Sequence, residues 1–232
     1  MAKNIAIILA GGKGSRFQSD IPKQFLILAG KTVLEHTLHT FQYNEYIDEI
    51  AVISNKDYIH VVEEIVRKND FTKVTKILNG GKERYESTLV ALNAFSEEAN
   101  LLIHDAVRPL VDDRIIHDVV KALKEYEAVN TVIPATDTML EVDESRHFIQ
   151  NIPDRNFLYR SQTPQAFKTH VLKKAYEKAL QDPNFTTTDD CGVVKKYLPE
   201  IKIKIVEGSN RNIKLTYQED FWLLEKLLQV KN

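Results

Sequence analysis

Short apolar runs rich in β-branched residues alternate along the chain with longer segments whose apolar residues recur every three or four positions. The short runs predict strands at residues 4–9, 49–54, 74–78, 101–104, 130–134 and 201–206. The longer segments predict helices at 33–41, 58–66, 89–95, 115–123, 171–180, 188–198 and 217–228. Strands that alternate with helices predict a mostly parallel sheet with helices on both faces.

This order of elements indicates a Rossmann-like α/β fold of three layers, α/β/α, in which ligands bind at the carboxyl ends of the strands. We expect one domain over residues 1–232, because no linker, repeat or low-complexity tract divides the chain. Residues 136–165 break the alternation, since they are polar and carry few helical signals. We predict that they form a β-arm that protrudes from the sheet. Thr216 and Glu219 predict a capping box at the last helix.

Composition narrows the expected environment and partners. The formal charge of −2 provides no general attraction for nucleic acid or anionic membranes. A single cysteine, Cys191, fits a reducing compartment, and no apolar run approaches the roughly 20 residues that span a bilayer. We therefore expect a cytoplasmic protein that binds neither nucleic acid nor membranes.

The loop after the first strand carries three glycines and two cations, namely Gly11, Gly12, Gly14, Arg16 and Lys23. Glycine amides can approach phosphate oxygens closely, and nearby cations favour an anionic ligand. A Walker A motif is excluded because Ser-Arg follows the last glycine, and a dinucleotide fingerprint lacks its third glycine. The alternative is an ordinary turn with two solvated cations. The combination favours a site for a triphosphate.

The chain resembles the methylerythritol-phosphate and ribitol-phosphate cytidylyltransferases in the motif Ala10-Gly11-Gly12-x-Gly14-x-Arg16 followed by Pro22-Lys23-Gln24. The resemblance covers the whole chain. The resemblance implies a base-recognition loop in Gly-Gly-Lys-Glu-Arg-Tyr-Glu-Ser, residues 80–87, which is otherwise an ordinary β-to-α turn. It implies nucleotide binding by Ala10, Gly11, Gly12, Gly14, Gly81, Lys82, Ser87, Asp105 and Ala106. It implies catalytic roles for Arg16, Lys23 and Lys214.

Asp105 follows the fourth predicted strand, where a carboxylate faces the expected ligand crevice and is suited to hold Mg²⁺ against the triphosphate. The alternative is that Asp105 caps the next turn or pairs with Arg108. We expect His104 to be packed or hydrogen-bonded rather than a ligand. Lys214 lies between apolar residues of an expected strand and points either to solvent or, as in the resembling enzymes, to the phosphates.

The resemblance also implies that the arm reaches a second subunit and forms a homodimer. Thr138 and Arg155 of one chain would then help to bind the acceptor substrate of the other, and Thr163 would contact the acceptor as well. From the residues alone, Arg155 is an ordinary surface cation on a loop.

The expected reaction is attack by the phosphate oxygen of a linear polyol phosphate on the α-phosphorus of CTP, which releases pyrophosphate. Thr136, where methylerythritol-phosphate enzymes usually carry a basic residue, favours D-ribitol 5-phosphate and the product CDP-ribitol. The alternative acceptor is 2-C-methyl-D-erythritol 4-phosphate of isoprenoid biosynthesis. Two further hypotheses are a nicotinamide-dependent oxidoreductase with a degenerate dinucleotide loop and a regulatory nucleotide-binding protein without turnover.

We predict that Lys23→Ala and Arg16→Ala each leave the fold intact and reduce turnover by orders of magnitude. Each substitution removes a fixed cation from the transition state, which typically costs about 3 kcal/mol of barrier. Circular dichroism would test the fold and pyrophosphate release the turnover. Near-normal turnover in either variant would contradict its catalytic role.

Overall fold

The computed structural model describes residues 2–12, 17, 21–95 and 98–229. Within these residues, seven strands form one sheet in the order β11-β7-β10-β6-β1-β4-β5. They are β1 (Lys3–Ala10), β4 (Glu49–Ser54), β5 (Val74–Asn79), β6 (Ala99–Asp105), β7 (Ala128–Pro134), β10 (Tyr159–Lys168) and β11 (Ile203–Glu207). All neighbouring pairs are parallel except those of β10, which runs antiparallel to both β6 and β7. The sheet is therefore mostly parallel, as predicted.

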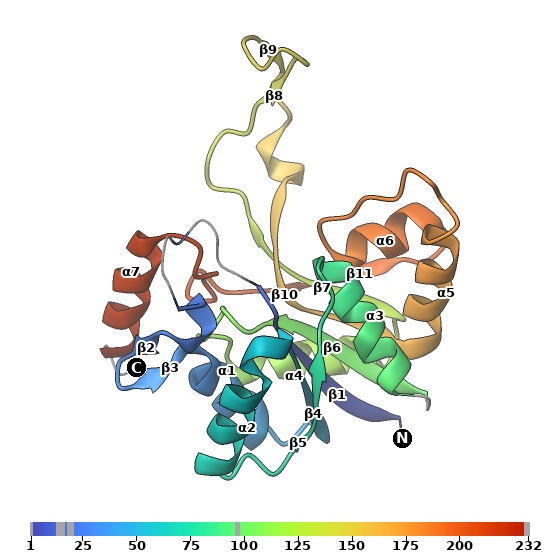
Figure 1. Cartoon of the computed structure of the whole chain (residues 1–232). Coiled ribbons are helices and arrows are strands. Elements are labelled where there is room, and N and C mark those ends of the chain that lie inside the picture. The colour runs from blue at the N-terminus through green and yellow to red at the C-terminus, as the bar shows by residue number, and fades with distance from the viewer. Residues whose placement is uncertain (1, 13–16, 18–20, 96–97, 230–232) are drawn as a thin grey trace.

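Helices cover both faces of the sheet (Figure 1). They are α1 (Val33–Tyr43), α2 (Ile59–Lys68), α3 (Arg84–Ala94), α4 (Asp113–Ala122), α5 (Thr169–Ala179), α6 (Asp190–Tyr197) and α7 (Gln218–Gln229). Alternate residues of β1 belong to different cores: Ile8 packs with α1, α2 and α4, whereas Ile7 packs with α3, α5 and α6. This alternation follows from the two-residue period of a strand and confirms the predicted three layers.

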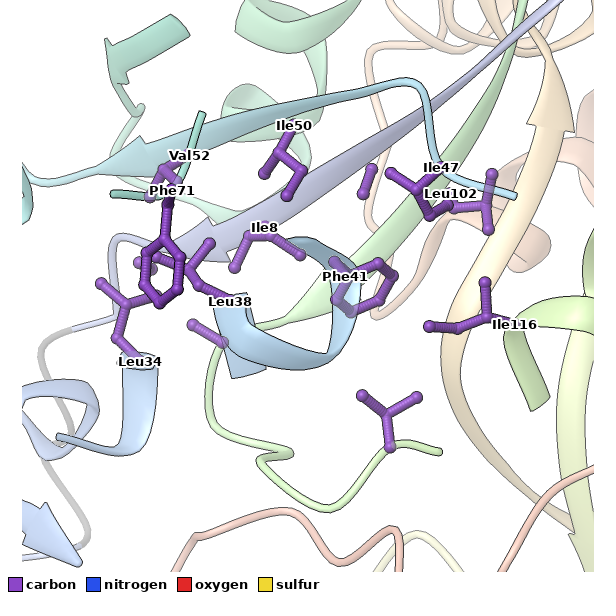
Figure 2. Close-up of a cluster of buried hydrophobic side chains, with 14 of the residues drawn as sticks. Ile8, Leu34, Leu38, Phe41, Ile47, Ile50, Val52, Phe71, Leu102 and Ile116 are labelled. Atoms are coloured by element: carbon purple, nitrogen blue, oxygen red, sulfur yellow. The ribbon is translucent and has the colours of Figure 1, made fainter. Parts of the chain in front are cut away.

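The first of these cores surrounds helix α1. Figure 2 shows Leu34, Leu38 and Phe41 of α1 directed at Ile8 of β1 and Ile50 of β4. All five side chains are fully buried. The helix begins with a capping box, in which Thr32 accepts from the Glu35 amide and Glu35 accepts from the Thr32 amide. Packing and capping together fix the helix that follows the glycine loop and η1 (Lys23–Phe25).

The arm leaves the sheet between β7 and β10 and projects away from the other elements (Figure 1). It carries a small hairpin of β8 (Glu141–Val142) and β9 (Ile149–Asn151), and the short helix η3 (Arg155–Phe157). β10 already begins at Tyr159, inside the predicted range 136–165, and pairs with β7 from there. The segment outside the main sheet is thus shorter at its carboxyl end than predicted.

The structure corrects three local predictions. Helix α3 begins at Arg84, five positions before the expected start, so its first turn faces the loop of residues 80–83. Residues 212–216, expected as a strand, form neither strand nor helix. The capping box of Thr216 and Glu219 is not formed; the carboxylate of Asp220 instead accepts from the amides of Thr216 and Tyr217, both at 2.8 Å.

Two smaller features complete the fold. A two-stranded ribbon of β2 (Ile27–Leu28) and β3 (Lys31–Thr32) lies near α7, and a short helix η2 (Lys56–Tyr58) precedes α2. Of the helices in the described residues, none has the length and apolar character needed to cross a membrane.

Candidate active site

A cleft of about 260 Å³ lies where β1 and β6 end and α3 begins. Its position at the carboxyl ends of parallel strands is where ligands bind in open α/β sheets. The cleft is lined by Leu9, Ala10, Gly11, Gly12, Lys23, Gln24, Gly81, Lys82, Glu83, Arg84, Ser87, Asp105, Val107 and Lys214. It thus brings together most of the predicted nucleotide-binding residues with Lys23 and Lys214, from segments far apart in the sequence.

The first wall of the cleft is the start of the glycine loop, held by Gln24. The buried Gln24 side chain donates to the carbonyl oxygen of Ala10 at 2.6 Å and to that of Gly12 at 3.2 Å. A Cβ atom on Gly12 would meet nothing within 4 Å, so this glycine borders open space rather than packed neighbours. Two predicted residues of the loop, Gly14 and Arg16, lie outside the described residues.

The second wall is the loop of residues 80–83, where the chain approaches α3 too closely for side chains. A Cβ atom on Gly81 would lie 2.1 Å from Cβ of Glu86, and one on Gly80 would lie 2.7 Å from the Ser87 hydroxyl oxygen. The Gly81 amide donates to that hydroxyl at 3.3 Å, and Glu86 accepts from the amides of Lys82 and Glu83. The glycines are therefore required by packing, and the loop presents a fixed backbone to the cleft.

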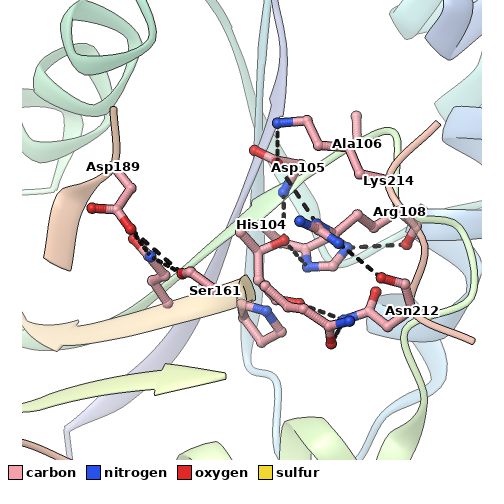
Figure 3. A network of polar contacts seen from close by, with 12 residues as sticks. His104, Asp105, Ala106, Arg108, Ser161, Asp189, Asn212 and Lys214 are labelled. Atoms are coloured by element: carbon pink, nitrogen blue, oxygen red, sulfur yellow. Dashed lines mark hydrogen bonds and ion pairs between the residues drawn. The ribbon is translucent and has the colours of Figure 1, made fainter. Parts of the chain in front are cut away.

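Asp105 is the centre of charge in the cleft. Its carboxylate lies 2.9 Å from Nζ of Lys214, 3.6 Å from Nε of Arg84 and 3.8 Å from Nε of Arg108. Figure 3 shows Lys214 and Arg108 approaching the carboxylate from the segment after residue 211 and from the turn after β6. The alternative pairing of Asp105 with Arg108 is therefore present, together with two further cations.

These cations control the ionisation of Asp105. Burial would raise its pKa, but the attraction of Lys214, Arg84 and Arg108 outweighs burial and holds the pKa well below its usual range. Asp105 is consequently an anion at every physiological pH, and it fixes three positive groups around one point of the cleft.

Arg84 is a cleft residue that the sequence analysis did not select. Its guanidinium bridges Asp105 and the fully buried Asp190, which also accepts from the Tyr176 hydroxyl at 2.6 Å. Burial would lower the pKa of Arg84, but Asp190 and Asp105 raise it above its ordinary value. The signal for Arg84 was its place within residues 80–87, three positions after Gly81. The signal for Gln24, which was not selected either, was its place directly after Pro22 and Lys23.

The remaining predicted residues lie elsewhere. Ala106 is fully buried beside the cleft, and its amide donates to the Leu9 carbonyl at 3.0 Å. Thr163 is buried next to His104 and Asp105. Thr138 and Arg155 are exposed on the arm, where Arg155 donates to the Thr136 carbonyl at 2.9 Å. Acceptor binding by Thr138, Arg155 and Thr163 stays a prediction.

The cleft fits a magnesium ion only in combination with a substrate. Among the described residues, no three histidine, cysteine or acidic side chains gather into a metal-binding group. Mg²⁺ commonly binds through one or two carboxylates, retained waters and substrate phosphates. The ionised Asp105 carboxylate has the chemistry of one such ligand.

Comparison with known proteins agrees with this geometry. The sequence pattern of the family "IspD: 2-C-methyl-D-erythritol 4-phosphate cytidylyltransferase" matches residues 4–230. The chain is 43% identical to 2-C-methyl-D-erythritol 4-phosphate cytidylyltransferase of Thermobifida fusca, covering 97% of this chain and 92% of that protein. The crystal structure of 4-diphosphocytidyl-2C-methyl-D-erythritol synthase from Anaerococcus prevotii superposes with a TM-score of 0.87 at 30% identity, covering 99% and 97% of the two chains.

A second kind of relative has a different acceptor in its name. The chain is 48% identical to the bifunctional ribulose 5-phosphate reductase/CDP-ribitol pyrophosphorylase Bcs1 of Haemophilus influenzae, over 99% of this chain. The chain spans about half (49%) of the length of that relative.

Fold, cleft and relatives together define a nucleotidyltransferase that uses CTP, a cytidylyltransferase. This result replaces the hypotheses of a nicotinamide-dependent oxidoreductase and of a nucleotide-binding protein without turnover. The chain belongs to the IspD family of cytidylyltransferases.

We predict that Asp105→Asn lowers the free energy of unfolding at pH 7 by about 2 kcal/mol. This lies between the cost of breaking an exposed ion pair, up to about 1 kcal/mol, and that of breaking a buried one, about 3–5 kcal/mol, because Lys214 is partly exposed and Arg84 keeps Asp190. The folded-state pKa of Asp105 lies below its unfolded value of about 3.9, so its contribution is present above that pH and is lost below it. Urea unfolding at pH 7 and about pH 3 should therefore show the difference between the two proteins narrowing in acid.

Asp118→Asn is the matched control, because Asp118 pairs with Arg114 on the surface, at 3.2 Å. Its effect should be about 0.5 kcal/mol or less. A difference between wild type and Asp105→Asn that is the same at both pH values would contradict the role assigned to the Asp105 charge.

Proposed function

We propose that the chain transfers CMP from CTP to D-ribitol 5-phosphate, forming CDP-ribitol and releasing pyrophosphate. The observation that carries the transfer step is the convergence of Lys23, Lys214 and Arg84 on one cleft, in which Lys214 and Arg84 pair with the Asp105 carboxylate. Fixed cations stabilise the negative charge that accumulates when one phosphate attacks another.

The acceptor is inferred from sequence similarity. The H. influenzae relative, whose name includes CDP-ribitol pyrophosphorylase, is 48% identical to this chain, whereas the T. fusca relative, named for methylerythritol phosphate, is 43% identical. Thr136, at the start of the arm, agrees with the ribitol alternative. The second candidate remains 2-C-methyl-D-erythritol 4-phosphate, which the family description and the solved structures favour.

In the proposed reaction, an oxygen of the ribitol phosphate attacks the α-phosphorus of CTP and the bond from that phosphorus to the bridging oxygen of the β-phosphate breaks. A phosphate monoester is mostly dianionic at pH 7, so the attack requires no dedicated general base. The glycine-loop amides and Lys23 orient the triphosphate, and the loop of residues 80–83 with Ser87 reads the cytosine. Lys214 neutralises charge at the phosphorus, with positioning as the main contribution of the protein.

Enzymes of this family generally depend on a divalent metal ion. We propose that Asp105 holds Mg²⁺ together with the phosphates of CTP. The bound ion would neutralise triphosphate charge and thereby favour departure of pyrophosphate. Asp105 has Lys214 as its partner at 2.9 Å, so the ammonium group is already beside the place where a phosphate would arrive.

A pyrophosphate-release assay with CTP and Mg²⁺ should give a kcat/KM for D-ribitol 5-phosphate at least about tenfold above that for 2-C-methyl-D-erythritol 4-phosphate. One extra methyl group is worth at least about that much discrimination in a fitted site, and one unpaired hydroxyl is worth more. Lys214→Ala should lose activity with both acceptors by about a hundredfold or more, because the lost cation acts on the nucleotide.

A preference for the branched acceptor would assign the chain to the second candidate. Activity of Lys214→Ala close to that of wild type would instead contradict the place given to Lys214, whichever acceptor is used.

We also propose that the arm pairs with a second copy of the chain. Several large apolar side chains on it are exposed, far more than a free surface loop usually carries: Met139, Leu140, Val142, Phe148, Ile149, Ile152, Phe157 and Tyr159. Phe157 is 82% exposed and Phe148 72%. The arm begins and ends at the edge of the sheet that holds the cleft. In a dimer, the arm of one chain could therefore bring its Arg155 and Thr138 to the acceptor in the cleft of the other chain.

Co-expression of an Arg155→Ala chain with a Lys214→Ala chain tests this arrangement. If one chain's arm completes the other's cleft, each mixed dimer has one intact site, and about a quarter of wild-type activity should return. Each variant alone should be nearly inactive, and the wild type should have the mass of a dimer in light scattering. A monomeric mass, or activity no higher than the mean of the two variants, would contradict the proposal.

A further inference from the structure

We propose that His104 is a positioning residue: a one-directional chain of hydrogen bonds through Thr163 and His104 holds Asp105, and Asn212, which binds Thr163 and Arg108, holds Lys214 beside it. The inference rests on the proposed function because it concerns Asp105 and Lys214, the two charged groups that have a role in the proposed reaction. The hydrogen bonds themselves belong to the folded protein, with or without substrate.

His104 is the residue before Asp105 on β6, and it is fully buried. Neighbouring residues of a strand point to opposite faces, so Asp105 reaches the cleft while the His104 ring packs against Phe41, with ring centroids 5.1 Å apart. In a neutral imidazole one ring nitrogen carries a hydrogen and the other is bare, and the contacts of the two nitrogens distinguish them.

The neighbours of the ring decide which nitrogen carries that hydrogen. Nε2 lies 3.2 Å from the carbonyl oxygen of Arg108, which can only accept, so Nε2 must be the donor. Nδ1 is then bare and accepts from the Thr163 hydroxyl at 3.0 Å. The same hydroxyl oxygen accepts from the Asp105 amide at 3.1 Å. The chain of donors thus runs from the Asp105 amide through Thr163 to His104, and from His104 to Arg108.

This chain closes the turn that carries Asp105. It joins the end of β6 to the Arg108 carbonyl and to the middle of β10, as Figure 3 shows around His104. If the ring were in the other tautomer, Nε2 and the Arg108 carbonyl would face each other as two acceptors. A single tautomer therefore fixes both the backbone of Asp105 and the turn after it.

Lys214 is held by the same group of contacts. Asn212, fully buried, donates from Nδ2 to the Thr163 carbonyl at 2.8 Å, and its own carbonyl accepts from Arg108 at 2.8 Å. The Leu215 amide donates to the Val107 carbonyl, also at 2.8 Å. Residues 212–216 belong to neither strand nor helix, so these bonds determine where Lys214 meets Asp105. The geometry of a site depends on the packing and the hydrogen bonds of the residues that support it.

Thr163 gains a role here that differs from acceptor binding. Its hydroxyl is engaged on both sides inside the protein, and the residue is 5% exposed. Loss of the hydroxyl should therefore misplace Asp105 and Lys214 and slow the chemical step, while the affinity for the acceptor changes little. Displacement of reacting groups by about 1 Å is enough to lower a rate by about a hundredfold.

The test compares Thr163→Val, which keeps the shape and removes the hydroxyl, with Thr163→Ser, which keeps the hydroxyl. Thr163→Val should lower kcat by roughly ten- to a hundredfold with the KM values for CTP and acceptor nearly unchanged. Thr163→Ser should restore kcat. Thr169→Val is the control: its buried hydroxyl donates to the Ala99 carbonyl at 2.9 Å, away from the cleft, so the variant should lose stability but keep kcat.

A second measurement does not depend on activity. Side-chain ¹⁵N NMR of the full chain at pH 7, with His104 assigned by comparison with His104→Gln, should show Nε2 protonated and Nδ1 bare. The Nδ1–H tautomer would overturn the proposal, as would equal kcat in Thr163→Val and Thr163→Ser. A rise in acceptor KM at unchanged kcat in Thr163→Val would overturn it in favour of direct acceptor binding. Absence of transfer by the wild type would refute the proposed function. The His104 tautomer measured by NMR would still show whether the hydrogen-bond chain runs in the proposed direction.

Discussion

The ion pair between Asp105 and Lys214 is the contact on which the cleft depends. It joins the end of β6 to a segment without regular structure near the C-terminus, at 2.9 Å. Alone, a lysine on such a segment would place its charge over a wide range of positions, because its side chain has many rotamers. With Arg84 and Arg108 on the same carboxylate, the protein holds three cations close together by placing one anion between them. The free energy needed to hold these charged groups together is supplied when the protein folds, before any substrate binds.

Everything else in the sheet serves to bring those segments to one edge. The parallel strands β1 and β6 end side by side, so the glycine loop and Asp105 start from neighbouring positions. The two cores on either side of the sheet keep these strand ends fixed, and the loop of residues 80–83 is packed closely against the start of α3. Residues 212–216 have no regular secondary structure of their own, and side-chain hydrogen bonds to buried partners hold them.

Much of this arrangement is predictable from the sequence. Apolar periodicity gave the layers, and the glycine loop and Asp105 were recognisable because each follows a strand. Residues 80–87 were selected through the resemblance to the cytidylyltransferases, since alone they indicate an ordinary turn. β10 was missed as a central strand because Pro164 interrupts it, and its register with β7 shifts between Ser161 and Gln165. The start of α3 was missed because Arg84, Tyr85 and Glu86 show no apolar period. Arg84 and His104 depend on partners distant in sequence, Asp190 and Thr163, which no local pattern reveals.

The direction of β10 has a consequence for how such an enzyme can change. Because β10 opposes its neighbours, its first residues emerge at the edge where β7 ends, and the whole excursion between them stands clear of both cores. Lengthening or rewriting that excursion costs little in chain entropy and disturbs no packed layer. The arm can therefore change in length and sequence while the packed layers, and the cleft that they position, stay as they are.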